Sequence, residues 1–192
     1  MRQAHLILIT GLPGTGKSTL ARALASRYHL PLICKDTIKE PLLDVIGARD
    51  RAQSRRLSDA SFAVMFALAR ECLSTGSDLV LEGNFRPGEH EAAVSALTAS
   101  TVQVAQVLCR TTDTVRIARL KARATDLSRH AGHRDADLAS DQLPPPIDFL
   151  ALPGHRFVFE SDARSAADVD TVRLQILLDA LDRWHRGDSH AG

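Results

Sequence analysis

The chain has 192 residues, of which 44% are hydrophobic and 24% are charged, and this balance is typical of a folded globular protein rather than a disordered one. Its formal net charge of +1 provides no overall field for holding nucleic acid or an anionic membrane, and an aromatic content of 4% leaves few stacking platforms for bases. We therefore expect a single domain over residues 1–192 with no membrane partner, and a nucleic-acid partner is disfavoured.

Hydrophobic periodicity predicts strands that alternate with helices along the chain. Short apolar runs predict strands at residues 5–10, 30–35, 79–85, 101–110 and 156–161. Apolar residues at helical spacing predict helices at 17–30, 36–47, 54–74, 89–99, 112–125 and 166–184. We expect Pro41 to interrupt the second of these helices. The alternation predicts an α/β fold, with a parallel sheet that helices cover on both faces.

Two segments of this pattern carry further expectations. The helix at 54–74 is expected to bury one apolar stripe, formed by Ala60, Ala63, Val64, Ala67, Leu68 and Leu73. The segment 126–153 is polar and then proline-rich, with little periodicity, and it is too long for a plain connection. We therefore expect a functional loop or lid at about residues 120–150.

The most specific motif follows the first predicted strand. The stretch "GLPGTGKST" contains G-x-x-x-x-G-K-S between a strand and a helix, which is the context that a phosphate-binding loop requires. Backbone N–H groups of the loop and of the helix start would surround a phosphate, Lys17 would reach the β- and γ-phosphates, and Ser18 would bind Mg²⁺. The predicted ligands are ATP, by default among nucleotides, and Mg²⁺. The expected nucleotide contacts are Gly11, Pro13, Gly14, Thr15, Gly16, Lys17, Ser18 and Thr19.

Asp36 is the candidate general base for phosphoryl transfer to an acceptor. It follows the second predicted strand, and open parallel sheets place their ligands at the carboxyl ends of strands. A carboxylate there can accept the proton of an acceptor hydroxyl. The alternative is that Asp36 caps the N-terminus of the next helix, and one residue can fill both roles. Lys35 and Lys39 flank Asp36 and are candidates for holding an anionic acceptor.

The end of the third predicted strand supplies a second group of polar residues. Glu82 suits an acidic group that serves Mg²⁺ through water, and it also borders the acceptor. Asn84 is either an acceptor ligand or a turn residue, and Arg86 follows at the same rim.

Arginines gather before and within the predicted lid. Arg119 and Arg123 are four residues apart on one helix face, where a closing lid can stabilise charge on the transferring phosphoryl group and exclude water. For Arg116 and Lys121 a solvated helix face is favoured instead. His130 and His133 have H-x-x-H spacing but no third ligand nearby, so the sequence leaves their role open.

The cysteines and the N-terminal segment indicate location only weakly. Cys34, Cys72 and Cys109 are far apart and form no C-x-x-C pair, so neither a disulfide framework nor a zinc site is indicated. The first apolar run is too short for a signal peptide, and a cytoplasmic location is expected.

The stretches "ITGLPGTGKSTLARALA", "LPLICKDTIKEPL" and "LVLEGNF" give the chain a family resemblance. From Ile7 to about Leu178 it resembles the small phosphate-loop kinases of the AAA_33, zeta-toxin or chloramphenicol-phosphotransferase type, and more distantly the kinase domain of polynucleotide kinase. The resemblance implies a P-loop NTPase fold with five parallel strands in the order 2-3-1-4-5. Acceptors vary widely among these enzymes, so it implies a kinase without naming the acceptor.

The resemblance also implies roles for single residues. The aspartate after the second strand is the general base in these relatives, which corresponds to Asp36. Lys39 stands where polynucleotide kinases have arginine, and this difference counts against a nucleic-acid acceptor. In "FESDA" the resemblance places Asp162 or its neighbours against adenine. The arginines of the R-x-x-x-R helix and the lid are Arg119, Arg123 and Arg129.

The interpretation favoured by these patterns is an ATP-dependent phosphotransferase that acts on a hydroxyl of a small molecule. One alternative is a nucleotide-binding ATPase or regulator without an acceptor of its own. Another is a polynucleotide or nucleotide-sugar kinase of zeta-toxin type. The sequence identifies neither the acceptor nor the oligomeric state.

Overall fold

A computed structural model describes residues 3–98, 102–126, 130, 145–162 and 171–186. Its sheet has five parallel strands in the order β2-β3-β1-β4-β5, which confirms the expected topology. The strands are β1 (Ala4–Gly11), β2 (Leu32–Cys34), β3 (Leu79–Glu82), β4 (Val102–Arg110) and β5 (His155–Glu160). None of the described helices combines the length and the apolar character that a membrane span needs.

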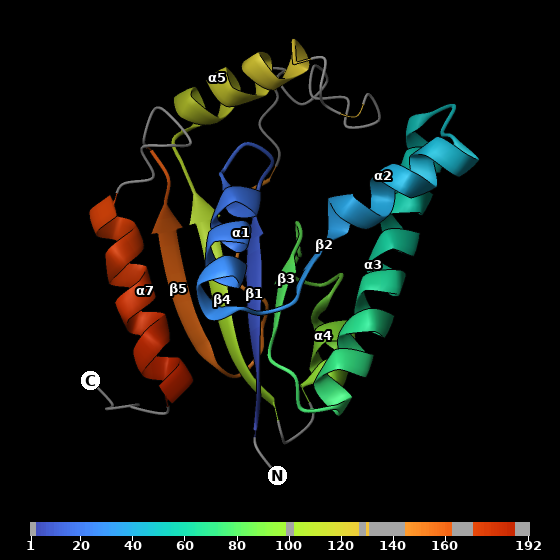
Figure 1. Cartoon of the computed structure of the whole chain (residues 1–192). Coiled ribbons are helices and arrows are strands. Elements are labelled where there is room, and N and C mark those ends of the chain that lie inside the picture. Colours follow the sequence, from blue (N-terminus) through green and yellow to red (C-terminus); the bar gives the residue numbers. More distant parts are fainter. Residues whose placement is uncertain (1–2, 99–101, 127–129, 131–144, 163–170, 187–192) are drawn as a thin grey trace.

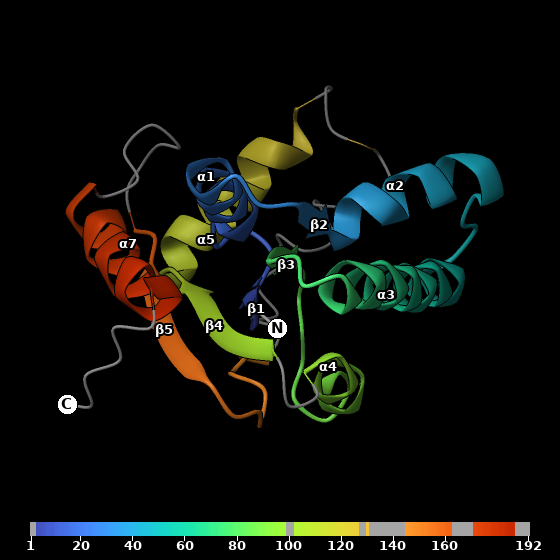
Figure 2. The same cartoon turned by 60° about the horizontal axis from the view of Figure 1, so that its bottom comes forward.

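Helices cover both faces of the sheet (Figures 1 and 2). They are α1 (Lys17–Tyr28), α2 (Lys35–Ile46), α3 (Arg51–Ser74), α4 (Glu91–Leu97), α5 (Asp113–Ala124) and α7 (Thr171–Arg186). Alternate residues of β1 enter two separate cores. Leu6 and Leu8 pack with residues of α3 and α4, whereas Ile7 and Ile9 pack with residues of α1 and α7. In Figure 1, α5 crosses above the carboxyl ends of the strands.

The expected break at Pro41 is wrong, because α2 runs without interruption from Lys35 to Ile46. Proline lacks the N–H that would bond to the carbonyl of Thr37 four residues earlier. Thr37 is exposed and α2 has no buried residue, so water can reach that carbonyl. The cost of Pro41 is therefore smaller here than inside a core helix.

The expected apolar stripe of α3 is also mostly wrong. Val64 and Leu68 are 43% and 47% exposed, and of the expected stripe only Leu73 is buried. The buried face is formed by Leu57, Ser61, Phe62, Met65, Phe66, Ala69 and Leu73. The helix is rotated so that the large side chains of Phe62 and Phe66 are buried in place of alanines, which removes more apolar area from water.

Candidate nucleotide-binding and phosphoryl-transfer site

The loop between β1 and α1 has the backbone conformation that its glycines permit. Gly14 and Gly16 have φ values of +89° and +80°, a region that residues with a side chain rarely adopt. Gly16 is also the N-cap of α1, so the helix begins directly at the loop. The Thr15 hydroxyl donates to the Leu12 carbonyl over 2.8 Å, which fixes the loop from within. The free N–H groups of a helix start lie at this loop, as anion binding requires.

Lys17, Ser18 and Glu82 meet at the carboxyl ends of β1 and β3. The parallel register pairs Ile9 with Glu82 and brings the carboxylate beside the loop. The Ser18 hydroxyl donates to Glu82 Oε2 over 3.2 Å, and Lys17 Nζ lies 3.6 Å from Oε1. Glu82 is only 2% exposed, so the ammonium of Lys17 compensates a buried charge. Hydroxyl and carboxylate oxygens are ligands that Mg²⁺ prefers, so this donor set fits the ion.

Asp36 lies at the same edge of the sheet as Glu82. The β2–β3 register pairs Cys34 with Glu82, and Asp36 follows in the first turn of α2. The capping alternative is wrong, because Cys34 is the N-cap and no side chain caps the helix. The Asp36 carboxylate accepts instead from Lys35 Nζ over 2.9 Å, and the Asp36 side chain is 37% exposed. It is therefore accessible from solvent and held by a cation.

Lys39 and the segment after β3 border this edge. Lys39 Nζ donates to Ser54 Oγ of α3 over 3.0 Å, and burial, with a smaller contribution from the positive charge of Lys35, lowers the Lys39 pKa. Asn84 is half-buried two residues after the end of β3, and the turn of this segment falls later, at 87–89. Arg86 is half-buried, and its side chain makes no hydrogen bond or ion pair within the part of the chain that the structure describes.

His90 holds this segment in place, a role that no sequence motif indicates. The backbone N–H of Arg86 donates to His90 Nδ1 over 3.0 Å, and the His90 ring lies 4.2 Å from the ring of Phe62. Burial lowers the His90 pKa, because a charged imidazole is disfavoured among aromatic rings. A neutral His90 thus fixes the segment that carries Asn84 and Arg86.

Arg119 of α5 contacts the phosphate loop. Its Nη1 donates to the Gly14 carbonyl over 3.2 Å and to Ser161 Oγ over 3.0 Å, and its Nη2 donates to the Ser161 carbonyl over 2.6 Å. Ser161 in turn donates to the Thr15 carbonyl over 2.7 Å. The guanidinium therefore links α5, the loop and the segment after β5. Arg123 is half-buried one turn further along α5.

Arg116 is not on a solvated face, contrary to expectation. It is 1% exposed, and its Cγ and carbonyl oxygen would lie 3.0 and 3.1 Å from a Cβ atom added to Gly14. Arg116 Nε donates to Asp113 over 3.1 Å, whereas Nη2 has no hydrogen-bond partner among the described residues. The sequence signal for this was the apolar Leu120 four residues later on the same helix face, and the structure shows Leu120 fully buried. Lys121 is exposed, as expected.

Asp162 joins the end of β5 to the start of α5. Its Oδ1 accepts from the Thr111 hydroxyl over 3.0 Å and from the Thr112 N–H over 2.9 Å. The contact places Asp162 beside the helix that carries Arg119. No described contact bears on its expected position against adenine.

Only parts of the predicted lid lie within the described residues. Arg129, and with it His133, falls outside them. His130 Nε2 lies 2.8 Å from Asp44 Oδ1, so the chain after α5 reaches α2. At the other end, Ile147 and Leu150 are buried, and Leu150 belongs to the core beside α3. That end of the predicted segment therefore contributes to the core.

The buried cysteines offer no nucleophile. Cys34 and Cys109 are free thiols, and burial raises the pKa of each to about 12. They stay protonated near neutral pH, so the chemistry of this edge rests on oxygen and nitrogen groups.

The AAA_33 family model, described as an AAA domain, matches residues 6–142. Among curated proteins, the uncharacterised protein Rv2004c of Mycobacterium tuberculosis (strain ATCC 25618 / H37Rv) is 33% identical over 104 residues, which are 50% of this chain. The aligned part is 21% of Rv2004c, so the chain spans about a fifth of the length of the curated relatives it matches.

Two solved structures show the same fold. A candidate kinase from Chloroflexus aurantiacus j-10-fl is similar with a TM-score of 0.79 and 29% identity, over 92% of this chain and 98% of that one. APS kinase CysC of Mycobacterium tuberculosis, solved in complex with AMPPNP and APS, has a TM-score of 0.54 and 16% identity, over 95% and 99% of the two chains. The fold is therefore that of phosphate-loop kinases.

Proposed function

This chain belongs to the AAA_33 family, and we propose that it is an ATP-dependent kinase that transfers the γ-phosphoryl group of ATP to a hydroxyl of a small molecule. The observation that carries the proposal is the contact of Lys17 and Ser18 with the buried Glu82 at the phosphate loop. This contact brings the Lys17 ammonium, which can bind phosphate, next to the Ser18 and Glu82 oxygens, which can serve as ligands of Mg²⁺.

The donor side binds and orients ATP. The backbone N–H groups of the loop hold the phosphates, Lys17 binds the β- and γ-phosphates, and Ser18 with Glu82 holds the ion, Glu82 through water. Bound Mg²⁺ supplies charge neutralisation on the β- and γ-phosphate oxygens.

The acceptor side lies on α2 and the segment after β3. Asp36 accepts the proton of the attacking hydroxyl, and Lys35 holds the carboxylate ready at 2.9 Å. Lys39, Asn84 and Arg86 bind the acceptor. Three features favour a small molecule over a nucleic acid on this side. Lys39 stands where polynucleotide kinases have arginine, the net charge of the chain is near zero, and the chain has few aromatic residues to stack on bases.

The arginines of α5 stabilise the charge of the transferring group. Arg119 is already fixed to the Gly14 carbonyl, and Arg123 lies one turn further along α5. Arg129, which falls outside the described residues, is proposed to act with them. The contact of His130 with Asp44 supports a lid that reaches from α5 to α2 and keeps water from the transferring group. The adenine is proposed to bind beside Asp162.

The test is ADP release from ATP and Mg²⁺, measured with and without a panel of hydroxylated metabolites, antibiotics and a 5′-hydroxyl oligonucleotide. We expect release that depends on a small acceptor and disappears in Lys17→Ala and Asp36→Asn, while Lys121→Ala, at an exposed position of α5, keeps it. Equal release with and without every acceptor would favour an ATPase or regulator. Dependence on the oligonucleotide alone would favour a polynucleotide kinase.

The role of Asp36 needs its own criterion. Asp36→Asn is nearly the same size and keeps a group that can accept from Lys35, so fold and ATP affinity are expected to remain. Full turnover in this variant, with fold and ATP affinity unchanged, would show that Asp36 is not the base.

A further inference from the structure

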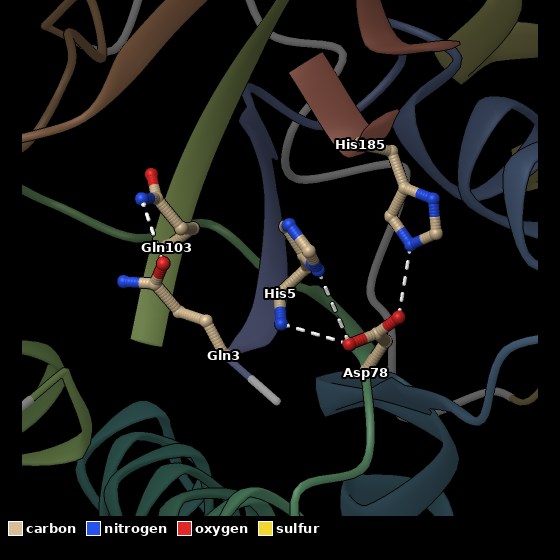
Figure 3. A network of polar contacts seen from close by, with 5 residues as sticks. All are labelled: Gln3, His5, Asp78, Gln103 and His185. Atoms are coloured by element: carbon tan, nitrogen blue, oxygen red, sulfur yellow. Dashed lines mark hydrogen bonds and ion pairs between the residues drawn. The ribbon is translucent and has the colours of Figure 1, made fainter. Parts of the chain in front are cut away.

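Two histidines and an aspartate meet at the end of the sheet opposite the phosphate loop (Figure 3). His5 lies in the first residues of β1, Asp78 directly precedes β3, and His185 belongs to the last turn of α7. Gly11 lies six residue steps after His5 along β1, which is roughly 20 Å at the rise of a strand. The cluster is therefore separate from the proposed transfer site and plays no part in it.

The carboxylate of Asp78 is fixed between the two imidazoles. His5 Nδ1 lies 3.3 Å from Oδ1 and His185 Nε2 lies 2.9 Å from Oδ2, so each ring aims one nitrogen at a different oxygen (Figure 3). The backbone N–H of His5 also donates to Oδ1 over 2.9 Å. The side chain of Asp78 is 4% exposed, so these contacts and its burial set its orientation.

We propose that His5, Asp78 and His185 form a binding site for a divalent transition-metal cation of the Zn²⁺ type. The three ligand atoms all lie within 4.8 Å of one another. Ligands at about 2.0–2.2 Å from Zn²⁺ lie roughly 3.0–3.5 Å apart, so small side-chain rotations bring them to one ion. The side chain of His185 is 28% exposed, which gives an ion access from solvent.

The ligand chemistry selects the class of ion. Imidazole nitrogen with one carboxylate suits Zn²⁺, Co²⁺, Ni²⁺ and Cu²⁺, whereas Mg²⁺ and Ca²⁺ require sets of oxygen ligands. Each neutral ring binds the ion through the nitrogen that now faces Asp78 and carries its proton on the other nitrogen. The backbone N–H of His5 remains bonded to the carboxylate and orients it from behind.

The ion would fasten the last turn of α7 to β1 and to the start of β3. Trp184 and Leu181 of α7 are already buried against the sheet, so the ion adds a polar link to an apolar contact. Because it binds the folded chain and links segments far apart in sequence, it is expected to raise the Tm.

The chain carries its own reporter beside the cluster. Trp184 is the only tryptophan, and its ring lies 5.0 Å from that of His5 and 6.4 Å from that of His185. Co²⁺ bound here quenches tryptophan fluorescence, whereas an ion at the phosphate loop is too distant for strong quenching. Excess Mg²⁺ in the buffer occupies the oxygen ligands of that loop.

The experiment titrates Co²⁺ into the full chain without an affinity tag and then adds Zn²⁺. We expect saturable quenching that Zn²⁺ reverses, and a Tm that rises by roughly several degrees with Zn²⁺. In His185→Gln, the Co²⁺ concentration that gives half-maximal quenching is expected to rise at least tenfold. The control is His155→Gln, because His155 lies 6.3 Å from the Trp184 ring but outside the cluster. Circular dichroism checks that both variants are folded.

Absence of saturable quenching in the wild-type chain would overturn the proposal and leave a hydrogen-bonded cluster of two histidines and one aspartate. Equal quenching in wild type and His185→Gln would also overturn it, since the ion would then be bound elsewhere. Weakening by His155→Gln as large as that by His185→Gln would overturn the assignment of these three ligands.

Discussion

The close packing of α5 on the phosphate loop makes Gly14→Ala a sharp test of this structure. Gly14 has φ +89°, and an alanine Cβ there would lie 3.0 Å from Arg116 Cγ and 3.1 Å from the Arg116 carbonyl oxygen. The left-handed backbone costs an alanine roughly 1–2 kcal/mol. The carbonyl cannot rotate away, so α5 must also shift, which adds about 1–3 kcal/mol of overpacking.

Gly76→Ala provides a matched control for the cost of placing an alanine in a left-handed backbone conformation. Gly76 has φ +77°, and an added Cβ would meet no atom within 4 Å. The difference between the two variants therefore isolates the packing of α5 on the loop. We expect Gly14→Ala to be less stable than Gly76→Ala by about 1–3 kcal/mol, or by roughly 2–12 °C in Tm for a chain of this size.

Urea unfolding measures this difference, and a titration with ATP measures its effect on the site. ATP affinity is expected to fall in Gly14→Ala, because the shifted loop no longer presents its N–H groups together, and to stay unchanged in Gly76→Ala. Equal stability and equal ATP affinity of the two variants would refute the described contact between Arg116 and the loop.

Three further predictions concern buried polar groups. Burial lowers the His90 pKa in the folded chain, so as the pH falls the imidazole of the unfolded chain is protonated first. The free energy of unfolding should therefore decrease as the pH falls below about 6.5. Urea unfolding at several pH values should show a smaller decrease for His90→Asn than for the wild type. Arg116→Met should leave the free energy of unfolding unchanged or raise it by about 1 kcal/mol, because Nη2 is buried without a described partner; a loss above about 2 kcal/mol would contradict this. Alkylation near neutral pH, followed by mass spectrometry, should modify Cys72 before Cys34 and Cys109, whose pKa values burial raises to about 12, and equal rates would be the contrary result.

The sequence predicted the sheet well, because strands buried on both faces are nearly continuous apolar runs. Their ends were harder to place. The third strand was expected to reach Phe85 but ends at Glu82, since the chain then turns to bury Phe85 completely in the core beside α3. An apolar residue after a strand looks like more strand until the packing partner is known.

Side-chain burial on helices was predicted less well, for a physical reason. Periodicity gives the spacing of a buried face but not its rotation, so Val64 was expected inside and Phe62 was missed. Arg116 was assigned to a solvated helix face, yet it is buried, because the absent side chain of Gly14 leaves room for it. Such a contact depends on two elements meeting, which one-dimensional patterns do not contain.

The geometry of the phosphate loop could be predicted from the sequence, whereas the acceptor could not. The phosphate loop is held by contacts from β3, α5 and the end of β5, through Glu82, Arg119 and Ser161, so its residues follow from one motif and its required surroundings. By contrast, α2 has no fully buried residue. Its Ile38 packs partly buried against the core beside α3, and polar contacts join Lys39 to α3 and Asp44 to His130. The exposed residues of α2 can change without disturbing either core. The proposed acceptor side can therefore vary among chains that share this donor site, and no common motif marks its substrate.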